Sequence, residues 1–268
     1  MVNKFLWQTI LEEGERLGIP KTKKRALIRE YLQSKIIFFL YSQTNSEKLS
    51  FIGGTSLRIL RDLDRFSEDL DFDNLGLTFK KIEKLFKNIF LKFEKEKFRI
   101  DFNLKKTDNS GIGGFKFKDL LFELGTSTDE KEKLNIKINY TTPKIKPETE
   151  VSILRRFGFL QPVITNKEDY ILSQKIRAAL TRKDPQPRDF YDIVWFLSHR
   201  VKPTPKLFPE IGVKTEKELF LTLSKIYERK IEPGLKNFKK RLKPFLLNEA
   251  NIYYLDIFKK TIEEQIQK

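Results

Sequence analysis

The sequence has 268 residues, enough for one large domain or two ordinary ones, and its 39% hydrophobic residues exclude wholesale disorder. Its 53 lysines and arginines exceed its 37 acidic residues and give a formal charge of +16, which suits a polyanionic partner but is also typical of lysine-rich solvated helices. No cysteine and only one histidine are present, so disulfides, thiolate metal sites and cysteine nucleophiles are excluded. Any catalysis must therefore use carboxylates, lysines, hydroxyls or a bound metal.

No apolar run is long enough to span a bilayer, and the N-terminus lacks a basic region followed by an apolar core. We therefore expect a cytoplasmic protein without a membrane partner.

The first elements expected are two helices and a short strand. Apolar spacing over residues 4–42 predicts two helices that are separated at Gly18-Ile19-Pro20. Residues 48–52 are an apolar run that ends in two glycines, which is typical of a buried strand entering a tight turn. Thr55 or Ser56 is expected to cap the helix that follows.

Charged and apolar residues alternate over residues 69–73, which predicts a second strand. An amphipathic helix is expected over 78–97, followed by three further strands at 98–105, 114–124 and 133–140. We interpret Gly111-Ile112-Gly113-Gly114 as a hairpin turn. This order predicts an α/β (α+β) fold in which helices cover a mixed sheet.

After Pro143 and Pro147 the pattern becomes helical to the end of the chain. Helices are expected near 167–182, 189–199, 217–230 and 248–267, the first of them capped by Thr165 or Asn166. The predicted domains are therefore residues 1–150, with the mixed sheet, and residues 151–268, with a helical fold.

The most informative feature is a glycine turn followed by paired carboxylates. Asp69 and Asp71 share one face of a strand, with Cα atoms about 6–7 Å apart. Two anions that close repel each other unless a cation lies between them, and Mg²⁺ prefers such oxygen ligands. The backbone N–H groups after Gly53-Gly54 can approach a phosphate at a helix start. A phosphate cradle and a metal-binding carboxylate pair suit phosphoryl or nucleotidyl transfer, although a plain turn and a solvated strand face are the simpler alternative.

Two segments carry a resemblance to a known family: Gly53-Gly54-Thr55-Ser56-Leu57 and Arg65-Phe66-Ser67-Glu68-Asp69-Leu70-Asp71-Phe72. They resemble the signature of the AbiEii/AbiGii-type nucleotidyltransferase toxins, which include the MenT toxins and belong to the polymerase-β-like nucleotidyltransferase superfamily. The resemblance implies that Gly53, Gly54, Thr55 and Ser56 hold a nucleoside triphosphate. It also implies that Asp69 and Asp71 are catalytic and bind Mg²⁺ or Mn²⁺.

A third carboxylate of the family pattern is replaced here, because Lys137-Ile138-Asn139 carries an amide at that place. Asn139 can still offer a neutral oxygen to a metal, but it cannot act as a base or neutralise a second metal ion. Asp73 and Asp101 are possible substitutes, and both are equally compatible with surface positions.

A second constellation lies on the helices expected after residue 167. Lys175 and Arg182 flank a small residue on one helix face, which can lie against a triphosphate, and Asp189 and Asp192 share a face of the next helix. Each also has a simple structural explanation, such as capping or a solvent-exposed charge. Lys175-Ile176-Arg177-Ala178-Ala179-Leu180 and Arg188-Asp189-Phe190-Tyr191-Asp192 also resemble later motifs of the family.

That second resemblance implies that Lys175 contacts the triphosphate and that Asp189, with Asp192, orients it or the acceptor. Arg182 and Arg188 are the further cations expected near the nucleotide. We assign no catalytic role to His199, which ends its helix.

Together these features predict a metal-dependent nucleotidyltransferase that transfers a nucleoside monophosphate from a triphosphate to an acceptor hydroxyl. The resemblance further implies a toxin of a toxin–antitoxin or abortive-infection system, with a separately encoded antitoxin, and an RNA acceptor such as a tRNA 3′ end. Two alternatives stay open from the sequence: a nucleotide- or RNA-binding module with little transferase activity, which Asn139 favours, and transfer to a small molecule.

Overall fold

The computed structural model of the protein describes residues 4–267, and the chain divides into two compact units, Met1–Thr165 and Asn166–Lys268. Each unit has its own core and is described by itself. A two-stranded hairpin over residues 149–166 ends at this division, whereas the boundary expected from the sequence, at residue 150, lies at the start of the hairpin.

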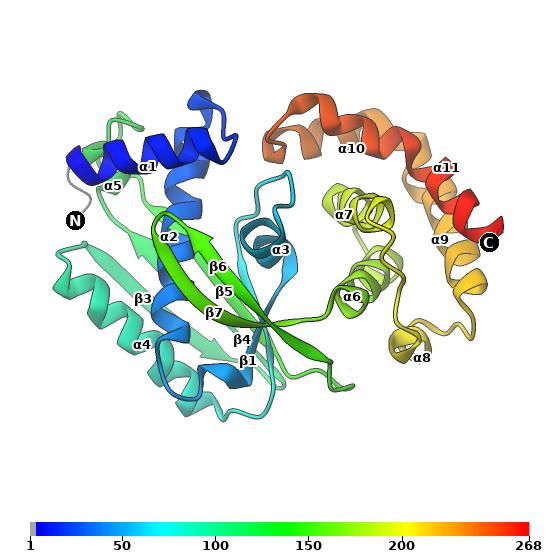
Figure 1. The fold of residues 1–268 in the computed structure, drawn as a ribbon, viewed down its shortest axis with the longest axis horizontal. Coiled ribbons are helices and arrows are strands. Elements are labelled where there is room, and N and C mark those ends of the chain that lie inside the picture. The colour runs from blue at the N-terminus through cyan, green and yellow to red at the C-terminus, as the bar shows by residue number, and fades with distance from the viewer. Residues whose placement is uncertain (1–3, 268) are drawn as a thin grey trace. The chain divides into compact units, whose positions relative to one another are not determined.

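The first unit is built on a mixed five-stranded sheet with the order β1-β2-β5-β4-β3 (Figure 1). Strands β2 and β5 are parallel, and the other neighbouring pairs are antiparallel. The expected α/β class, with helices covering a mixed sheet, is therefore confirmed. The elements are α1 (Lys4–Arg16), α2 (Lys24–Tyr41), β1 (Leu49–Ile52), α3 (Gly53–Arg61), β2 (Leu70–Asn74), α4 (Phe79–Lys95), β3 (Ile100–Lys106), β4 (Ser110–Phe117), α5 (Leu120–Glu123), β5 (Leu134–Thr141), β6 (Thr149–Arg156) and β7 (Phe159–Asn166).

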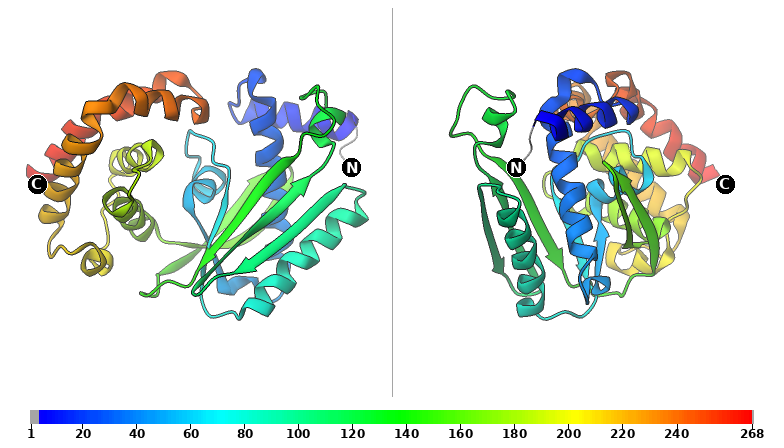
Figure 2. Two further views of the ribbon diagram at one scale, coloured as in Figure 1. Left: turned by 180° about the vertical axis from the view of Figure 1, so that it is seen from behind. Right: turned by 60° about the vertical axis from the view of Figure 1, so that its left-hand side comes forward.

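Phenylalanine forms much of the core on one face of this sheet. Alternate residues of a strand point to the same face, so Phe51, Phe72 and Phe115 lie on the side that α4 covers. The ring of Phe86, on α4, lies 5.8 Å from that of Phe72 and 6.5 Å from that of Phe115. Figure 2 shows α4 running alongside the sheet, next to β3. The helix-covered face is thus dry and aromatic, and the strands present their polar residues on the opposite face.

The hairpin of β6 and β7 corrects the expectation that the chain turns helical after Pro147. Phe157 and Gly158, which connect the strands, have φ values of 51° and 77°, the geometry of a tight hairpin turn. The hairpin packs on α2, where Phe157 and Phe159 contact the ring of Tyr31. Its buried apolar residues are Leu154 and Val163, whereas Val151 and Leu160 are exposed, so the hairpin shows no regular apolar alternation in the sequence.

Three smaller expectations are also wrong. Gly111–Gly114 lies inside β4 and pairs with both neighbouring strands rather than forming a turn. The strand expected over 114–124 ends at Phe117 and is followed by α5. No side-chain cap is made at the starts of α3 and α6, where Ile52 and Lys167 hold the cap positions.

The second unit is helical, as expected. Its main helices are α6 (Glu168–Thr181), α7 (Pro187–Ser198), α8 (Phe208–Ile211), α9 (Glu216–Lys230), α10 (Leu235–Leu242) and α11 (Tyr254–Gln267). Helix α7 is buried over most of its length because α6, α10 and α11 all pack against it. Its Phe190 contacts the rings of Tyr227, Phe238 and Phe258, which come from α9, α10 and α11. Three other helices thus join one aromatic core around α7.

None of the helices described between residues 4 and 267 combines the length and the apolar character that a membrane span requires.

Candidate functional site

The expected carboxylate pair lies at the start of β2. Asp71 is in this strand and Asp69 directly precedes it, so both side chains leave the same face of the sheet and both are partly exposed. The residues between and after them, Leu70 and Phe72, point into the core and are at most 1% exposed. The buried apolar residues therefore fix the side on which the carboxylates stand.

The glycine turn contacts this carboxylate pair directly. Gly53 has φ of 79°, a conformation that is strained for other residues, and a Cβ built there would lie 2.5 Å from Oδ2 of Asp71. Only a glycine therefore allows the backbone at the start of α3 to come this close to the carboxylate. The first N–H groups of α3 have no partner within the helix, so this helix start can bind an anion.

Thr55 joins the two halves of the site through its side chain. Its hydroxyl donates a hydrogen bond to the backbone carbonyl of Asp69 at 2.5 Å, and the residue is 1% exposed. Ser56 is fully buried, and its Oγ has no hydrogen-bond partner among the described residues. That Thr55 and Ser56 help to hold a triphosphate stays a prediction, and both of their hydroxyls are buried. The hydroxyl of Thr55 holds the glycine turn against the carboxylate strand.

Asn139 lies beside Asp71, because β5 pairs with β2 in a register that sets these two residues opposite each other. Its Nδ2 donates a hydrogen bond to Oδ1 of Asp71 at 2.9 Å. The structure thus brings together Asp71, Asn139 and the glycine turn. The amide of Asn139 therefore restrains the carboxylate of Asp71, the predicted metal ligand. If the amide were rotated by 180°, its oxygen would take the place of Nδ2 beside Asp71.

The two substitute carboxylates differ in position. Asp73 is on the same face of β2 as Asp71 but is 4% exposed, in register with Ser50. Asp101 is on β3, at the far edge of the sheet, and forms an ion pair of 2.6 Å with Lys118. Three strand spacings of about 4.8 Å separate β3 from β2, so Asp101 is too far away to complete the pair.

Arg65 is a residue of the motif for which the sequence predicts no role. It is fully buried, and its Nη1 donates to the backbone carbonyl of Phe66 at 2.9 Å. A Cβ built at Gly54 would lie 2.8 Å from Nη2 of Arg65 and equally close to Oγ of Ser67. The guanidinium therefore lies directly behind the second glycine of the turn. Its place in the motif was a signal, but its burial could not be read from the sequence.

In the second unit, Lys175 and two aspartates form a buried charge cluster. Nζ of Lys175 lies 2.8 Å from Asp192 and 3.3 Å from Asp189, whose side chains are at most 1% exposed. Arg182 adds a second cation, 2.6 Å from Asp189. Two cations thus balance two buried carboxylates, and the aspartates hold the ammonium of Lys175 in a fixed place.

Arg188, the remaining predicted cation, is not part of this cluster. Its guanidinium lies 5.8 Å from the ring centre of Phe245, and the side chain is half-buried. This is cation–π packing within the second unit.

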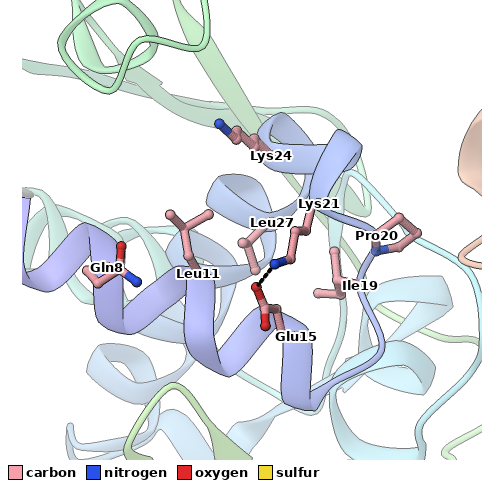
Figure 3. Close-up of a pocket in the computed structure, with 8 residues that line it drawn as sticks. All are labelled: Gln8, Leu11, Glu15, Ile19, Pro20, Lys21, Lys24 and Leu27. Carbon is pink, nitrogen blue, oxygen red and sulfur yellow. Dashed lines mark ion pairs between the residues drawn. The ribbon is translucent and has the colours of Figure 1, made fainter.

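A cavity of about 270 Å³ lies elsewhere in the first unit, beside α1 and α2 (Figure 3). Apolar side chains such as Leu11, Ile19 and Leu27 line it, and Lys21 forms an ion pair of 2.7 Å with Glu15 at its rim. This pair raises the pKa of Lys21 through the hydrogen bond and charge of Glu15. None of the lining residues belongs to the candidate site.

Comparisons with solved structures agree with this fold. JHP933 from Helicobacter pylori is 21% identical over 91% of this chain and 94% of its own, with a TM-score of 0.56. A putative nucleotidyltransferase from H. pylori is 20% identical over 91% and 96%, with a TM-score of 0.57. MenT4, a nucleotidyltransferase toxin from Mycobacterium tuberculosis, is 15% identical over 98% and 89%, with a TM-score of 0.58. No curated protein sequence matches the chain.

The sequence itself matches one protein family over most of its length. The match covers residues 39–263 and includes both the glycine turn with its carboxylates and the charge cluster of the second unit. The family is described as “Nucleotidyl transferase AbiEii toxin, Type IV TA system”. The chain therefore belongs to the AbiEii family of nucleotidyltransferase toxins from type IV toxin–antitoxin systems.

Proposed function

We propose that this toxin transfers a nucleoside monophosphate from a nucleoside triphosphate to a hydroxyl of an RNA acceptor, with Asp69 and Asp71 binding Mg²⁺ or Mn²⁺. The family establishes a nucleotidyltransferase toxin with an antitoxin partner. One observation carries the finer proposal: the backbone of Gly53 packs directly against the carboxylate of Asp71. A phosphate bound at the turn would thus lie next to a carboxylate able to share a metal with it.

The residues present fit a divalent metal that arrives together with the nucleotide. No group of three or more His, Cys, Asp or Glu side chains able to hold a metal is found among residues 4–267. Mg²⁺ in nucleotide-dependent enzymes is commonly held by one or two carboxylates plus substrate phosphates, rather than by an all-protein cage. Asp69, Asp71 and a rotated Asn139 amide supply such an incomplete oxygen set. When bound, the metal would neutralise charge on the phosphates.

The chain's own residues would supply binding and orientation. The N–H groups of Gly53, Gly54 and Thr55 at the start of α3 would donate to phosphate oxygens. The hydroxyl of Thr55 would keep this turn in register with Asp69, and the amide of Asn139 would keep Asp71 in one orientation. An acceptor hydroxyl would then attack the α-phosphorus, and pyrophosphate would leave. Position and charge neutralisation are the main requirements of this chemistry.

For the second unit, the proposal concerns the roles of its residues. Lys175 would contact the triphosphate, and Asp189 and Asp192 would hold its ammonium ready to do so. Arg182 and Arg188 would add positive charge for the nucleotide. Residues 166–268 would thus act as a domain that completes the activity.

An RNA acceptor, such as a tRNA 3′ end, suits the formal charge of +16, because lysine-rich surfaces gain affinity when phosphates release their counterions. We place this reaction in the cytoplasm, where the triphosphate, RNA and a separately encoded antitoxin would all be present.

The test is incorporation of each radiolabelled triphosphate into total RNA, with and without Mg²⁺, by the wild type and by Asp71→Asn. We expect metal-dependent labelling of RNA that falls at least 100-fold in the variant, because the amide removes one metal-binding charge. Asp101→Asn is the matched control, since this carboxylate is at the far edge of the sheet. Undiminished labelling by Asp71→Asn, or labelling in EDTA, would contradict the mechanism.

A further inference from the structure

The face of the sheet opposite α4 carries an exposed polar surface over β3, β4 and β5, next to the carboxylate pair. The register places Asp71, Asn139, Ile112 and Lys105 in one row across β2, β5, β4 and β3. The neighbouring rows contain Lys137 with Asn103, and Asn135 with Lys116 and Asp101. Intervening residues such as Ile138 and Phe115 are fully buried on the helix-covered face. We call Lys105, Lys116, Lys137, Asn103, Asn135 and Ile112 the open face.

The open face is strongly basic. Its three lysines are exposed, and Lys118 and Lys133 lie just beyond the ends of β4 and β5. Apart from Asp71 of the carboxylate pair, the acidic side chain in these rows is Asp101. The pKa of Asp101 is lowered, first by its hydrogen bond with Lys118 and then by the charges of Lys118, Lys133 and Lys116. The lysines therefore converge on one area of the sheet.

The remaining residues of the open face suit a nucleic acid strand. Asn103 and Asn135 are exposed amides that can donate to and accept from sugars and bases. Ile112 is 55% exposed between them and the carboxylates, where an apolar side chain can pack on a ribose or base. Adjacent strands lie about 4.8 Å apart, so the row from Lys105 to Asp71 spans roughly 14 Å. A chain bound across these rows would have one end at Asp71.

We propose that the open face binds the RNA acceptor as a single strand and leads its reactive end to Asp69 and Asp71. The proposal rests on the proposed function for the identity of the strand. Exposed lysines in three successive rows of the sheet match the repeated charges of a phosphate backbone better than the irregular charges of an acidic protein. The open face has no aromatic side chain for base stacking, so phosphate contacts dominate and base preference is weak.

The first experiment measures binding of a short fluorescein-labelled single-stranded RNA by anisotropy, without nucleotide. The test variant is Lys105→Ala/Lys116→Ala/Lys137→Ala. The control is Lys80→Ala/Lys84→Ala/Lys87→Ala, which removes the same charge from exposed positions on α4. Losing three phosphate contacts should weaken binding roughly 100-fold near 0.1 M salt and lower the salt-dependence slope by about 2, while the control stays close to wild type. Equal losses in both variants, or none in the first, would overturn the proposal.

The second experiment uses the wild-type protein and does not depend on a variant folding. Bound RNA should protect Lys105, Lys116 and Lys137 from acetylation, but not Lys80, Lys84 or Lys87, as measured by mass spectrometry. Equal protection of both sets would overturn the proposal, and tighter binding of DNA of the same sequence would overturn the assignment to RNA.

Both experiments contain no triphosphate, so they succeed or fail independently of nucleotide transfer. If Asp71→Asn binds RNA normally but wild type shows no incorporation, the proposed function fails and the open face stands. If wild type incorporates nucleotide normally but the open-face variant binds RNA like wild type, the proposed function stands and the open-face proposal fails.

Discussion

The contact between Gly53 and Asp71 makes a sharp prediction at the scale of single residues. In Gly53→Ala the new methyl group would lie 2.5 Å from Oδ2 of Asp71, and the residue would keep a φ of 79°. We expect the carboxylate to be displaced and nucleotide incorporation to fall by at least tenfold, with a stability loss of about 1–2 kcal/mol from the backbone strain. Labelled-nucleotide incorporation and thermal unfolding measure the two effects.

Gly18→Ala is the matched control for that variant. Gly18 also has a positive φ, 68°, but nothing lies within 4 Å of a Cβ built there. The control should lose a similar amount of stability and keep its activity. If both variants lose activity alike, strain rather than the contact with Asp71 is responsible.

Asn139 should limit the affinity of the free protein for metal. Asn139→Asp would add a carboxylate beside Asp71, at the cost of their hydrogen bond. We expect the nucleotide-free protein to bind Mn²⁺ more tightly, on the order of tenfold, because a third charge joins the oxygen set. Calorimetric titration with Mn²⁺ measures this change.

The control is Asn135→Asp on the same strand, an exposed position in register with Lys116. Asn135→Asp adds the same negative charge at a distance from Asp69 and Asp71, so the affinity for Mn²⁺ should not change. Equal gains in both variants would mean that overall charge, rather than the place of Asn139, sets metal affinity.

At the scale of single residues, the sequence predicted that Asp69 and Asp71 share one face of a strand, but it did not predict which side chains of the two motif segments are buried. Alternation along the strand was enough to set Asp69 and Asp71 on one face. The burial of Thr55, Ser56 and Arg65 depends on chain segments that fold over the turn, and no local pattern encodes that. The sequence therefore places Thr55 and Ser56 in the predicted phosphate-binding turn but does not show that their side chains are buried.

At the scale of elements, the charge cluster between α6 and α7 should be decisive for the stability of the second unit. Lys175→Ala would leave Asp189 and Asp192 buried with too little compensating charge, which typically costs about 3–5 kcal/mol. Arg182→Ala removes a cation that is 44% exposed, and should cost about 1 kcal/mol or less. Urea unfolding compares the two, and an equal loss would mean that the ammonium does not stabilise the buried carboxylates. Activity of Lys175 variants must therefore be compared at equal folded fraction.

Tyr227 should make the packing of α9 on α11 sensitive to alkali. Its hydroxyl donates to the carbonyl of Leu255 at 2.8 Å, and burial, followed by the charges of Glu232 and Asp256, raises its pKa to about 12. A raised pKa stabilises the fold below the ordinary value near 10, and this contribution is lost as the pH rises towards 12. Tyr227→Phe should lose about 1 kcal/mol at pH 7 and show a weaker decline of the urea midpoint between pH 9 and about 11.

The control for this series is Tyr253→Phe, whose side chain is 46% exposed. It should retain the wild-type midpoint and the wild-type alkaline decline. A decline in Tyr227→Phe as steep as that of wild type would show that other groups cause the alkaline instability.

Long amphipathic helices such as α2, α4 and α9 were predictable because their apolar period persists over several turns. The hairpin of β6 and β7 was missed because prolines precede it and its apolar residues do not alternate regularly with polar ones. The glycines of β4 look like a turn in the sequence, yet pairing with β3 and β5 on both sides holds them in a strand. Tertiary pairing thus overrode local preference in both cases.

For the whole molecule, metal and nucleotide should stabilise the fold only together. The candidate site offers two carboxylates, and no larger acidic cluster is found among the described residues. The metal therefore lacks ligands without the triphosphate, and the charge of the triphosphate is not neutralised without the metal. A Mg²⁺–triphosphate complex at 100 times its dissociation constant should add about 2.7 kcal/mol to the free energy of unfolding. Thermal unfolding should show this gain with both ligands, its loss in EDTA and its absence in Asp71→Asn. A full gain from either ligand alone would contradict this mode of binding.

The fully buried guanidinium behind Gly54 also restricts how this sequence can change over evolutionary time. A side chain at position 54 would occupy the space of Arg65 and Ser67, and Arg65 has no exposed surface towards which to move. A larger residue at position 54 is therefore tolerated only with a compensating change at position 65. None of the ten intervening positions lies among the nearest atoms to a Cβ built at Gly54, so homologous toxins that carry a larger residue at position 54 should also have changed at position 65.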